Sequence, residues 1–176
     1  ADIALERDDE GIRADGTIVL DAGGNFARFE ISGLLNWVSE IIDLGISFDK
    51  LSPVVVAALD PRLSQLDRFK LPVSGTLALS LAASLAVEDV NFDLTGGAGK
   101  IVVPEVYPDP LAVTQFALKG RATETFGKVV IDAAMIDVGG PVVTLSGELE
   151  RSDKSVEFQI ETSVKALPID ELQRLW

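Results

Sequence analysis

The chain has 176 residues, of which 47% are hydrophobic, and 15 basic against 28 acidic residues give a net charge of −13. This size and hydrophobicity suffice for one large domain with a sizeable core, and they exclude a disordered chain. The negative charge repels phosphate backbones, so nucleic acid is not an expected partner. Histidine and cysteine are both absent, which excludes the Ser-His-Asp triad, thiol nucleophiles and most zinc sites.

Membrane-targeting signals are not predicted in this sequence. No run reaches about 18 consecutive apolar residues, and no basic segment precedes a short apolar run at the start. The chain begins with Ala1 and stops at Trp176 inside a predicted helix. We therefore expect it to be a slice of a longer protein.

The first region, residues 1–33, has the pattern of a β-hairpin. Asp2–Arg7 and Gly16–Asp21 are the two expected strands, and the acidic segment Asp8–Gly11 is the expected turn. Phe26–Ile31 is a candidate third strand.

The second region, residues 34–70, is predicted to be helical. Its first part, Leu34–Leu44, repeats apolar residues at intervals of three and four, which favours a short amphipathic helix ended by Gly45. Further on, Ser52-Pro53 and Asp60-Pro61 are helix-start signals, so a broken pair of helical turns is expected between Ser52 and Leu66.

The third region, residues 71–168, alternates apolar with polar or small residues in short segments that end at glycines or turns. Leu77, Leu79 and Leu81 show the two-residue period of a strand with one apolar face. Residues 169–176 begin a helix entered through Pro168. The expected fold class is α+β and β-dominated, a coiled antiparallel β meander (a β-groove or half-barrel) with a few short helices.

Several segments imitate functional motifs. Gly96–Lys100 resembles a phosphate loop, but Leu94 stands where its first glycine belongs and Ile101 where Ser or Thr belongs. Asp8–Glu10 and Asp49 lack the spacing of a calcium loop. None of the carboxylates forms a recognisable acid–base pair, so we expect no catalytic residue, no metal site and no cofactor.

Four motifs in succession carry a family resemblance: Leu71–Leu77, Phe92–Pro104, Val138–Val143 followed by Ser146-Gly147, and Leu167–Trp176. Together they resemble the AsmA-like superfamily, in particular the YhdP-type and TamB-related envelope proteins of Gram-negative bacteria. The resemblance is clearest from about Leu51 to Trp176.

The resemblance implies an inner-membrane anchor, outside this sequence, followed by a long periplasmic array of repeats that forms an open groove with an apolar interior. It further implies passage of phospholipid between the inner and outer membranes, influence on outer-membrane integrity, and no enzymatic activity. The expected partners are phospholipid acyl chains, neighbouring repeats of the same chain, and the inner membrane through the anchor. The expected lipid-binding residues share one strand face: Leu77, Leu79, Leu81, Phe92, Leu94, Phe116, Leu118, Val129, Ile131, Met135, Val143, Leu145, Phe158 and Ile160.

Two other interpretations remain open from the sequence. An apolar strand face is most often the inside of a sandwich or half-barrel, and the helices of residues 34–66 could cover it. The chain would then be a structural or protein-interaction scaffold in outer-membrane biogenesis. A hydrolase without histidine is the third interpretation, and no organised catalytic signal favours it.

Overall fold

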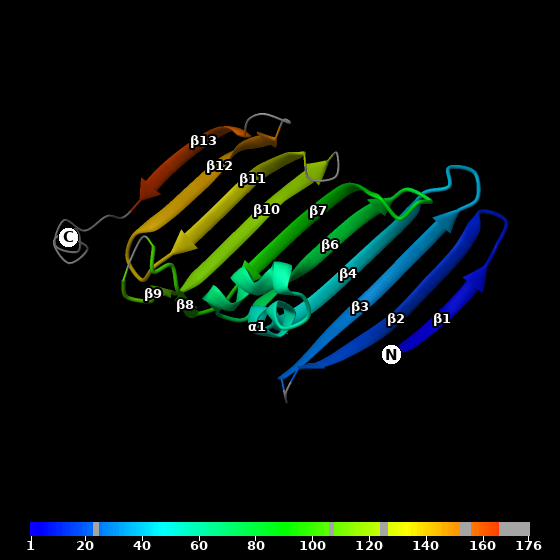
Figure 1. The fold of residues 1–176 in the computed structure, drawn as a ribbon, viewed down its shortest axis with the longest axis horizontal. Helices are drawn as coiled ribbons and strands as arrows, with labels where there is room; N and C mark the ends of the chain where they lie inside the picture. Colours follow the sequence, from blue (N-terminus) through cyan, green and yellow to red (C-terminus); the bar gives the residue numbers. More distant parts are fainter. Residues whose placement is uncertain (23–24, 106–107, 124–126, 152–155, 166–176) are drawn as a thin grey trace.

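One large antiparallel sheet dominates the computed structural model, which describes residues 1–22, 25–105, 108–123, 127–151 and 156–165. The sheet has ten strands in the order β1-β2-β3-β4-β6-β7-β10-β11-β12-β13, and every neighbouring pair is antiparallel (Figure 1). It is open, with β1 and β13 as its edges. The strands are β1 (Asp2–Arg7), β2 (Gly11–Ala22), β3 (Asn25–Asn36), β4 (Ile42–Leu51), β6 (Val73–Leu81), β7 (Val87–Gly96), β10 (Gln115–Thr123), β11 (Lys128–Asp137), β12 (Val142–Arg151) and β13 (Val156–Lys165). The predicted β-dominated antiparallel fold is confirmed.

The predicted N-terminal hairpin and third strand are present as β1, β2 and β3. The acidic turn is closed by Asp8, whose Oδ1 accepts hydrogen bonds from the backbone N–H groups of Glu10 (2.8 Å) and Gly11 (2.9 Å). Aspartate is favoured at this position because its side-chain oxygen can accept the hydrogen bonds that a backbone carbonyl would accept in a tight turn.

The predicted helix over Leu34–Leu44 is wrong. The segment contains the end of β3, a turn and the start of β4. Asn36 builds the turn, because its Oδ1 accepts hydrogen bonds from the N–H groups of Val38 (2.8 Å) and Ser39 (3.1 Å). The apolar spacing of three and four arose from two strand ends on either side of this turn. Gly45, the predicted helix stop, lies inside β4 opposite Ser32 and Ala78.

The predicted helical turns after Ser52 are present. Helix α1 (Pro53–Ala57) begins with proline in its first turn, and a 3-10 helix, η1 (Pro61–Arg68), follows. Proline suits this position because the first helical N–H groups have no partner within the helix. The two short helices lie in front of one face of the sheet in Figure 1.

A second sheet of three strands lies at the same end of the molecule. It has the order β5-β8-β9, made by β5 (Phe69–Lys70), β8 (Gly99–Ile101) and β9 (Leu111–Val113). Strand β5 belongs to the connection from β4 to β6, whereas β8 and β9 belong to the connection from β7 to β10. The two connections therefore pair with each other, and together with α1 and η1 they form what we call the cap.

A salt bridge and a backbone hydrogen bond fasten these two connections. The guanidinium group of Arg68 donates to both carboxylate oxygens of Glu105, at 2.9 and 2.6 Å. The backbone N–H of Val102 donates to the carbonyl oxygen of Arg68 at 2.9 Å. The first of these interactions is the charge-assisted, two-pronged geometry that fixes orientation most strongly.

The buried core is concentrated beneath the cap. One cluster consists of Leu71, Val73, Ile101 and Val113, and the other of Ala27, Leu51 and Val55. Val55 of α1 is only 2% exposed. Outside these clusters, most apolar side chains of the large sheet are half-buried or exposed.

The large sheet includes strands from both sides of each predicted region boundary, at residues 33–34 and 70–71. Strand β3 runs through residues 33 and 34 without interruption, and β4 pairs with β6 across the cap segment. Leu71, the first residue of the predicted meander, is buried. The predicted helix of residues 169–176 lies outside the described residues.

Candidate functional site

One face of the large sheet carries apolar side chains on all ten strands. Paired residues of an antiparallel sheet lie side by side on the same face, and alternate residues of a strand share a face. Ile46 is paired with Leu77, and Leu77 is paired with Phe92. These residues and the partners that follow them therefore lie on one face across the sheet. We call this the apolar face. Its larger side chains are those of Ile3, Leu5, Ile12, Ile18, Leu20, Phe29, Ile31, Leu35, Ile42, Leu44, Ile46, Phe48, Val73, Leu77, Leu79, Leu81, Val90, Phe92, Leu94, Phe116, Leu118, Val129, Ile131, Ile136, Val143, Leu145, Leu149, Phe158, Ile160 and Val164.

All the predicted lipid-binding residues lie on the apolar face except Met135. The exception is caused by a β-bulge in β11, where Lys119 is opposite Ala133 but Gly120 is opposite Ile131. The additional residue is Asp132, and it shifts the alternation by one position. Ala134 and Ile136 therefore take the places that a regular strand would give to Ala133 and Met135.

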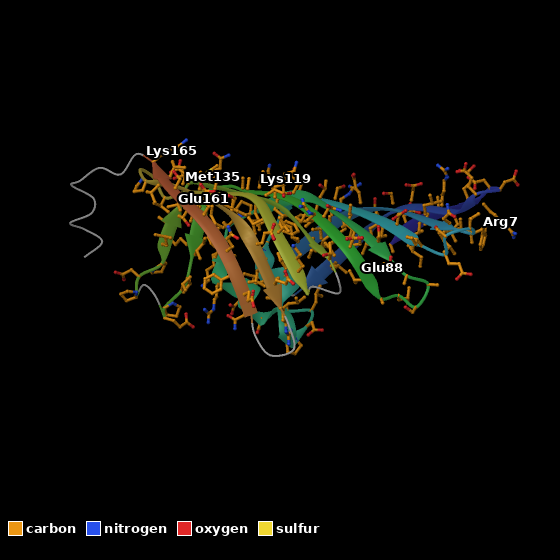
Figure 2. The ribbon with its side chains drawn as sticks, turned by 90° about the horizontal axis from the view of Figure 1, so that it is seen from above. Arg7, Glu88, Lys119, Met135, Glu161 and Lys165 are labelled. Carbon is orange, nitrogen blue, oxygen red and sulfur yellow. The ribbon has the colours of Figure 1, made fainter. Side chains whose placement is uncertain are left out.

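Met135 lies on the opposite, polar face. Figure 2 shows it on the same side of the sheet as Lys119, Glu161 and Lys165. We call this side the polar face. Its charges form cross-strand salt bridges between Asp93 and Lys119 (3.3 Å), Arg121 and Asp132 (3.0 Å), and Lys128 and Glu148 (3.1 Å).

One end of the apolar face lies beneath the cap. Leu94, Phe116 and Ile136 pack against the buried cluster that contains Leu71 and Val113. Of the predicted lipid-binding residues, Leu94 and Phe116 thus contribute to the core.

The rest of the apolar face is less covered. Phe158 and Ile160 on β13 are 70% and 51% exposed, and Ile3 and Leu5 on β1 are 55% and 72% exposed. Between these edges, Leu77, Leu79, Leu118, Ile131 and Leu145 are half-buried, mainly by neighbours within the sheet. Among the described residues, no second layer lies over this part of the face.

Two glycines make room for phenylalanine rings on the apolar face. A Cβ atom at Gly120 would stand 2.8 Å from the ring of Phe92, and one at Gly96 would overlap the ring of Phe116. The two phenylalanine rings therefore lie across glycine positions of the neighbouring strand instead of standing upright. Glycine permits this close approach because it has no side chain.

A hollow lies on the polar face, over the N-terminal strands. It has a volume of about 730 Å³, and its polar lining includes Asp2, Asp15, Thr17, Glu30 and Ser47. The lining also includes Ile31, Ile46 and Leu77, but an acyl chain there would desolvate its acidic and hydroxyl groups. The apolar face is an open surface, whereas the hollow is a shallow depression with carboxylate and hydroxyl groups in its lining.

Among the described residues, the carboxyl groups of Asp8 and Glu105 have shifted pKa values, and both lie outside the apolar face. Hydrogen bonds from the backbone N–H groups of Gly11 and Glu10, with Arg13 nearby, hold the pKa of Asp8 below its ordinary value. The hydrogen bonds from Arg68 likewise lower the pKa of Glu105. Both shifts stabilise charged turn or cap residues and provide no proton donor at neutral pH.

Within the described ranges, no group of three or more acidic side chains is placed to hold a metal ion. No helix in these ranges has both the length and the apolar character needed to cross a bilayer.

The N-terminal half of the apolar face was not among the predicted lipid-binding residues. Ile42, Leu44, Ile46 and Phe48 alternate with polar or small residues and belong to this surface. Their two-residue period was the available signal, but Ile42 and Leu44 fall within the predicted helix. The sequence also contained a signal for the bulge that moves Met135. Asp132 and Asp137 are five positions apart, so a regular strand could not place both on one polar face.

Comparison with protein-family models, with curated proteins and with solved structures finds no match to this chain.

Proposed function

We propose that this chain is a non-catalytic segment of a periplasmic conduit for phospholipid between the inner and outer membranes, and that it contributes to outer-membrane integrity. The observation that carries the proposal is the apolar face, which crosses ten strands and is uncovered by other described elements beyond the cap. Soluble proteins rarely expose a contiguous apolar surface of such extent without a binding partner.

Acyl chains fit this surface chemically. Each buried CH₂ group contributes roughly 0.8 kcal/mol and requires no hydrogen bond. Leu79, Ile131 and Leu145 offer aliphatic contact without a polar group between them. A charged headgroup could remain in water beyond the strand ends, so the net charge of −13 does not oppose binding of single lipids.

The location in the periplasm, the inner-membrane anchor and the neighbouring repeats come from the AsmA-like resemblance. In the proposal, the anchor and the repeats belong to other parts of a longer protein. The neighbouring repeats would extend the apolar face beyond this segment.

A protein-interaction scaffold in outer-membrane biogenesis is the second candidate. The cap favours it, because the part of the apolar face near Leu71 and Phe116 is ordinary core. In that case a partner protein would cover the open part of the face instead of lipid.

Site-specific photo-crosslinking in the cell envelope separates the two candidates. A benzophenone amino acid is introduced at Leu79 or Ile131 on the apolar face, and at Met135 on the polar face as the matched control. The conduit predicts phospholipid adducts, identified by mass spectrometry, at Leu79 and Ile131 but not at Met135. Protein adducts alone at Leu79 and Ile131 would support the scaffold, and equal lipid labelling at all three positions would contradict a specific lipid surface.

Lipid content of the purified chain provides an independent measurement. Organic extraction should recover phospholipid in stoichiometric amount, whereas an unrelated acidic β-rich protein should yield none. Leu79→Asp should abolish recovery while circular dichroism remains unchanged, because a buried CH₂ contact is replaced by a charge. Ala78→Asp, one residue away on the polar face, is the control and should retain the lipid.

A further inference from the structure

Charged residues are divided unequally between the two faces of the large sheet. At the paired positions of the apolar face in the described ranges, every residue is uncharged except Arg7 on β1 and Arg151 on β12. The charged residues at its bulges have no paired position: Asp49, Lys50, Glu88 and Asp132. The paired positions of the apolar face therefore carry only positive charge, in a chain whose net charge is −13.

Both arginines lie at the end of the apolar face that is farthest from the cap. Strands β1 and β12 run in the same direction, away from α1 in Figure 1, and end at Arg7 and Arg151. The two connections of the cap follow β4 and β7, which run in the opposite direction. The pairing places Arg7 in one row with Ile12, Leu35 and Ile42, which we call the outer row. Arg151 takes the outermost paired position on β12.

The distance between the outer row and the cap suits one acyl chain. On β3, Leu35 belongs to the outer row, and Phe29 packs against the buried cluster that contains Val55 of the cap. At about 3.4 Å per residue, Leu35 and Phe29 are about 20 Å apart along the strand. The hydrocarbon core of a bilayer is about 30 Å thick, so the acyl chains of one leaflet span about 15 Å. An acyl chain that lies along the strands therefore fits between the outer row and the cap.

The guanidinium group of Arg7 is available to an anion. It lies over the ring of Trp37, 5.5 Å from the ring centre, and such stacking leaves the N–H donors at its edge free. No carboxylate pairs with it among the described residues, and Asp8 and Glu10 of the adjacent turn pair with Arg13 instead, at 3.2 and 3.3 Å. A free guanidinium edge suits phosphate, whose oxygens accept two parallel hydrogen bonds from it.

The opposite orientation of a lipid would place its headgroup against the core. Where the apolar face meets the cap, it presents Phe29, Phe48 and Leu94, which all pack against the buried clusters. A phosphate group beside these side chains would lose hydration without gaining a side-chain donor from them. The cap end therefore suits the acyl chains, and the outer row suits the headgroup.

We propose that a phospholipid on the apolar face lies along the strands, with its acyl chains toward the cap and its phosphate at the outer row, where Arg7 binds it. Strands β1 and β12 are eight strand spacings apart, about 38 Å at about 4.8 Å per spacing, so Arg151 binds the phosphate of a second lipid. This inference rests on the proposed function, because it assigns an orientation and a headgroup contact to the lipid of the conduit.

The orientation is tested on the 176-residue chain with spin-labelled lipids. Trp176→Phe leaves Trp37 as the only tryptophan. The chain is incubated with phosphatidylcholine vesicles that contain a lipid with a nitroxide either on its headgroup or at the end of an acyl chain, and the vesicles are then removed. The headgroup label should quench Trp37 fluorescence more strongly than an equal amount of retained acyl-end label. Equal quenching, or stronger quenching by the acyl-end label, would overturn the orientation.

The variant Arg7→Gln tests the phosphate contact. Binding of phosphatidylcholine and of diacylglycerol, both labelled near the glycerol, is followed through the quenching of Trp37. Because charge-assisted hydrogen bonds to phosphate are lost, Arg7→Gln should weaken phosphatidylcholine binding about tenfold. It should leave the affinity for diacylglycerol unchanged, since that lipid has no phosphate. Arg28→Gln removes the same charge from the polar face of β3 and should alter neither affinity.

The outcomes separate this inference from the proposed function. If Arg7→Gln leaves phosphatidylcholine binding unchanged, or weakens the binding of both lipids equally, the role of Arg7 is overturned. Lipid retention with the reverse order of quenching contradicts the orientation alone. If the unmodified chain retains none of these lipids after the vesicles are removed, the proposed function fails together with the inference.

Discussion

The covered and open parts of the apolar face have the same kinds of side chain but different surroundings. Beneath the cap, Leu94 and Phe116 pack against the buried cluster around Leu71 and Val113, which two mutually paired connections supply. Toward β13, Phe158 and Ile160 occupy equivalent positions on the same face and remain more than half exposed. Alternation of apolar residues thus determines which face of a sheet is apolar, whereas the connections between strands determine which part of that face becomes core.

Truncation of one large apolar residue in the cap and one on β13 should give the largest difference in the free energy of unfolding. Leu71→Ala removes buried contacts beneath the cap and should lower the free energy of unfolding by about 2–5 kcal/mol. Phe158→Ala removes an exposed side chain and should change it by less than about 0.5 kcal/mol. Urea unfolding with an unchanged m-value measures both, and equal losses would mean that β13 is as well packed as the cap.

Polar substitution on the two faces of β11, just beyond its bulge, should have the next largest effect on stability. Ile136→Gln places an amide against the buried cluster and should cost about 2–4 kcal/mol. Met135→Gln, on the polar face, should cost less than about 0.5 kcal/mol. Thermal and urea unfolding of the two variants compare adjacent residues, and the reverse order would contradict the observed bulge.

A methyl group added beneath the cap tests how tightly it is packed. Gly96→Ala would overlap the ring of Phe116 and approach Leu71, so we expect a loss of about 1–3 kcal/mol. Gly97→Ala is the neighbouring control, since its Cβ atom would meet only Pro72, at 3.3 Å. A stability difference near zero between the two variants would show that the cap can move away from the sheet.

The smallest expected effect is on the β1–β2 turn, at the edge farthest from β13. Because the folded-state pKa of Asp8 is below its ordinary value, its contribution is present above the ordinary carboxyl pKa of about 4 and is lost as the pH falls through the folded-state pKa. Asp8→Asn should remove this pH dependence from the β1–β2 hairpin. Hydrogen exchange of its amides between neutral and acidic pH measures the effect, and an unchanged acid sensitivity in the variant would exclude Asp8 as its cause.

The sequence was sufficient where a strand had a simple two-residue period. Leu77, Leu79 and Leu81 were assigned to the correct type of element and to one common face, as were Val143 and Leu145 on β12. Pro53 likewise predicted helical structure, because its fixed φ acts within a single turn, although Ser52 makes no side-chain hydrogen bond at the cap position.

The errors have local physical causes. Around Asn36, a five-residue connection placed apolar residues at helix-like intervals, although they belonged to the end of β3, the connection and the start of β4. At Asp132, one additional residue moved Met135 to the polar face. The cap could not be predicted, because β5, β8 and β9 have only two or three residues each and owe their positions to packing around Leu71 and Ile101.

The order of strands in the large sheet follows the order of the chain throughout. Each strand of the sheet therefore depends chiefly on its immediate neighbours, as repeats do in a linear array. Such a sheet can form by successive addition of strands, without a search for distant pairing partners, and its loop-closure cost is small at each step. Opening should begin at β1 and β13 and proceed inward, so that β6 and β7, which lie between the two connections of the cap, exchange their amide hydrogens last.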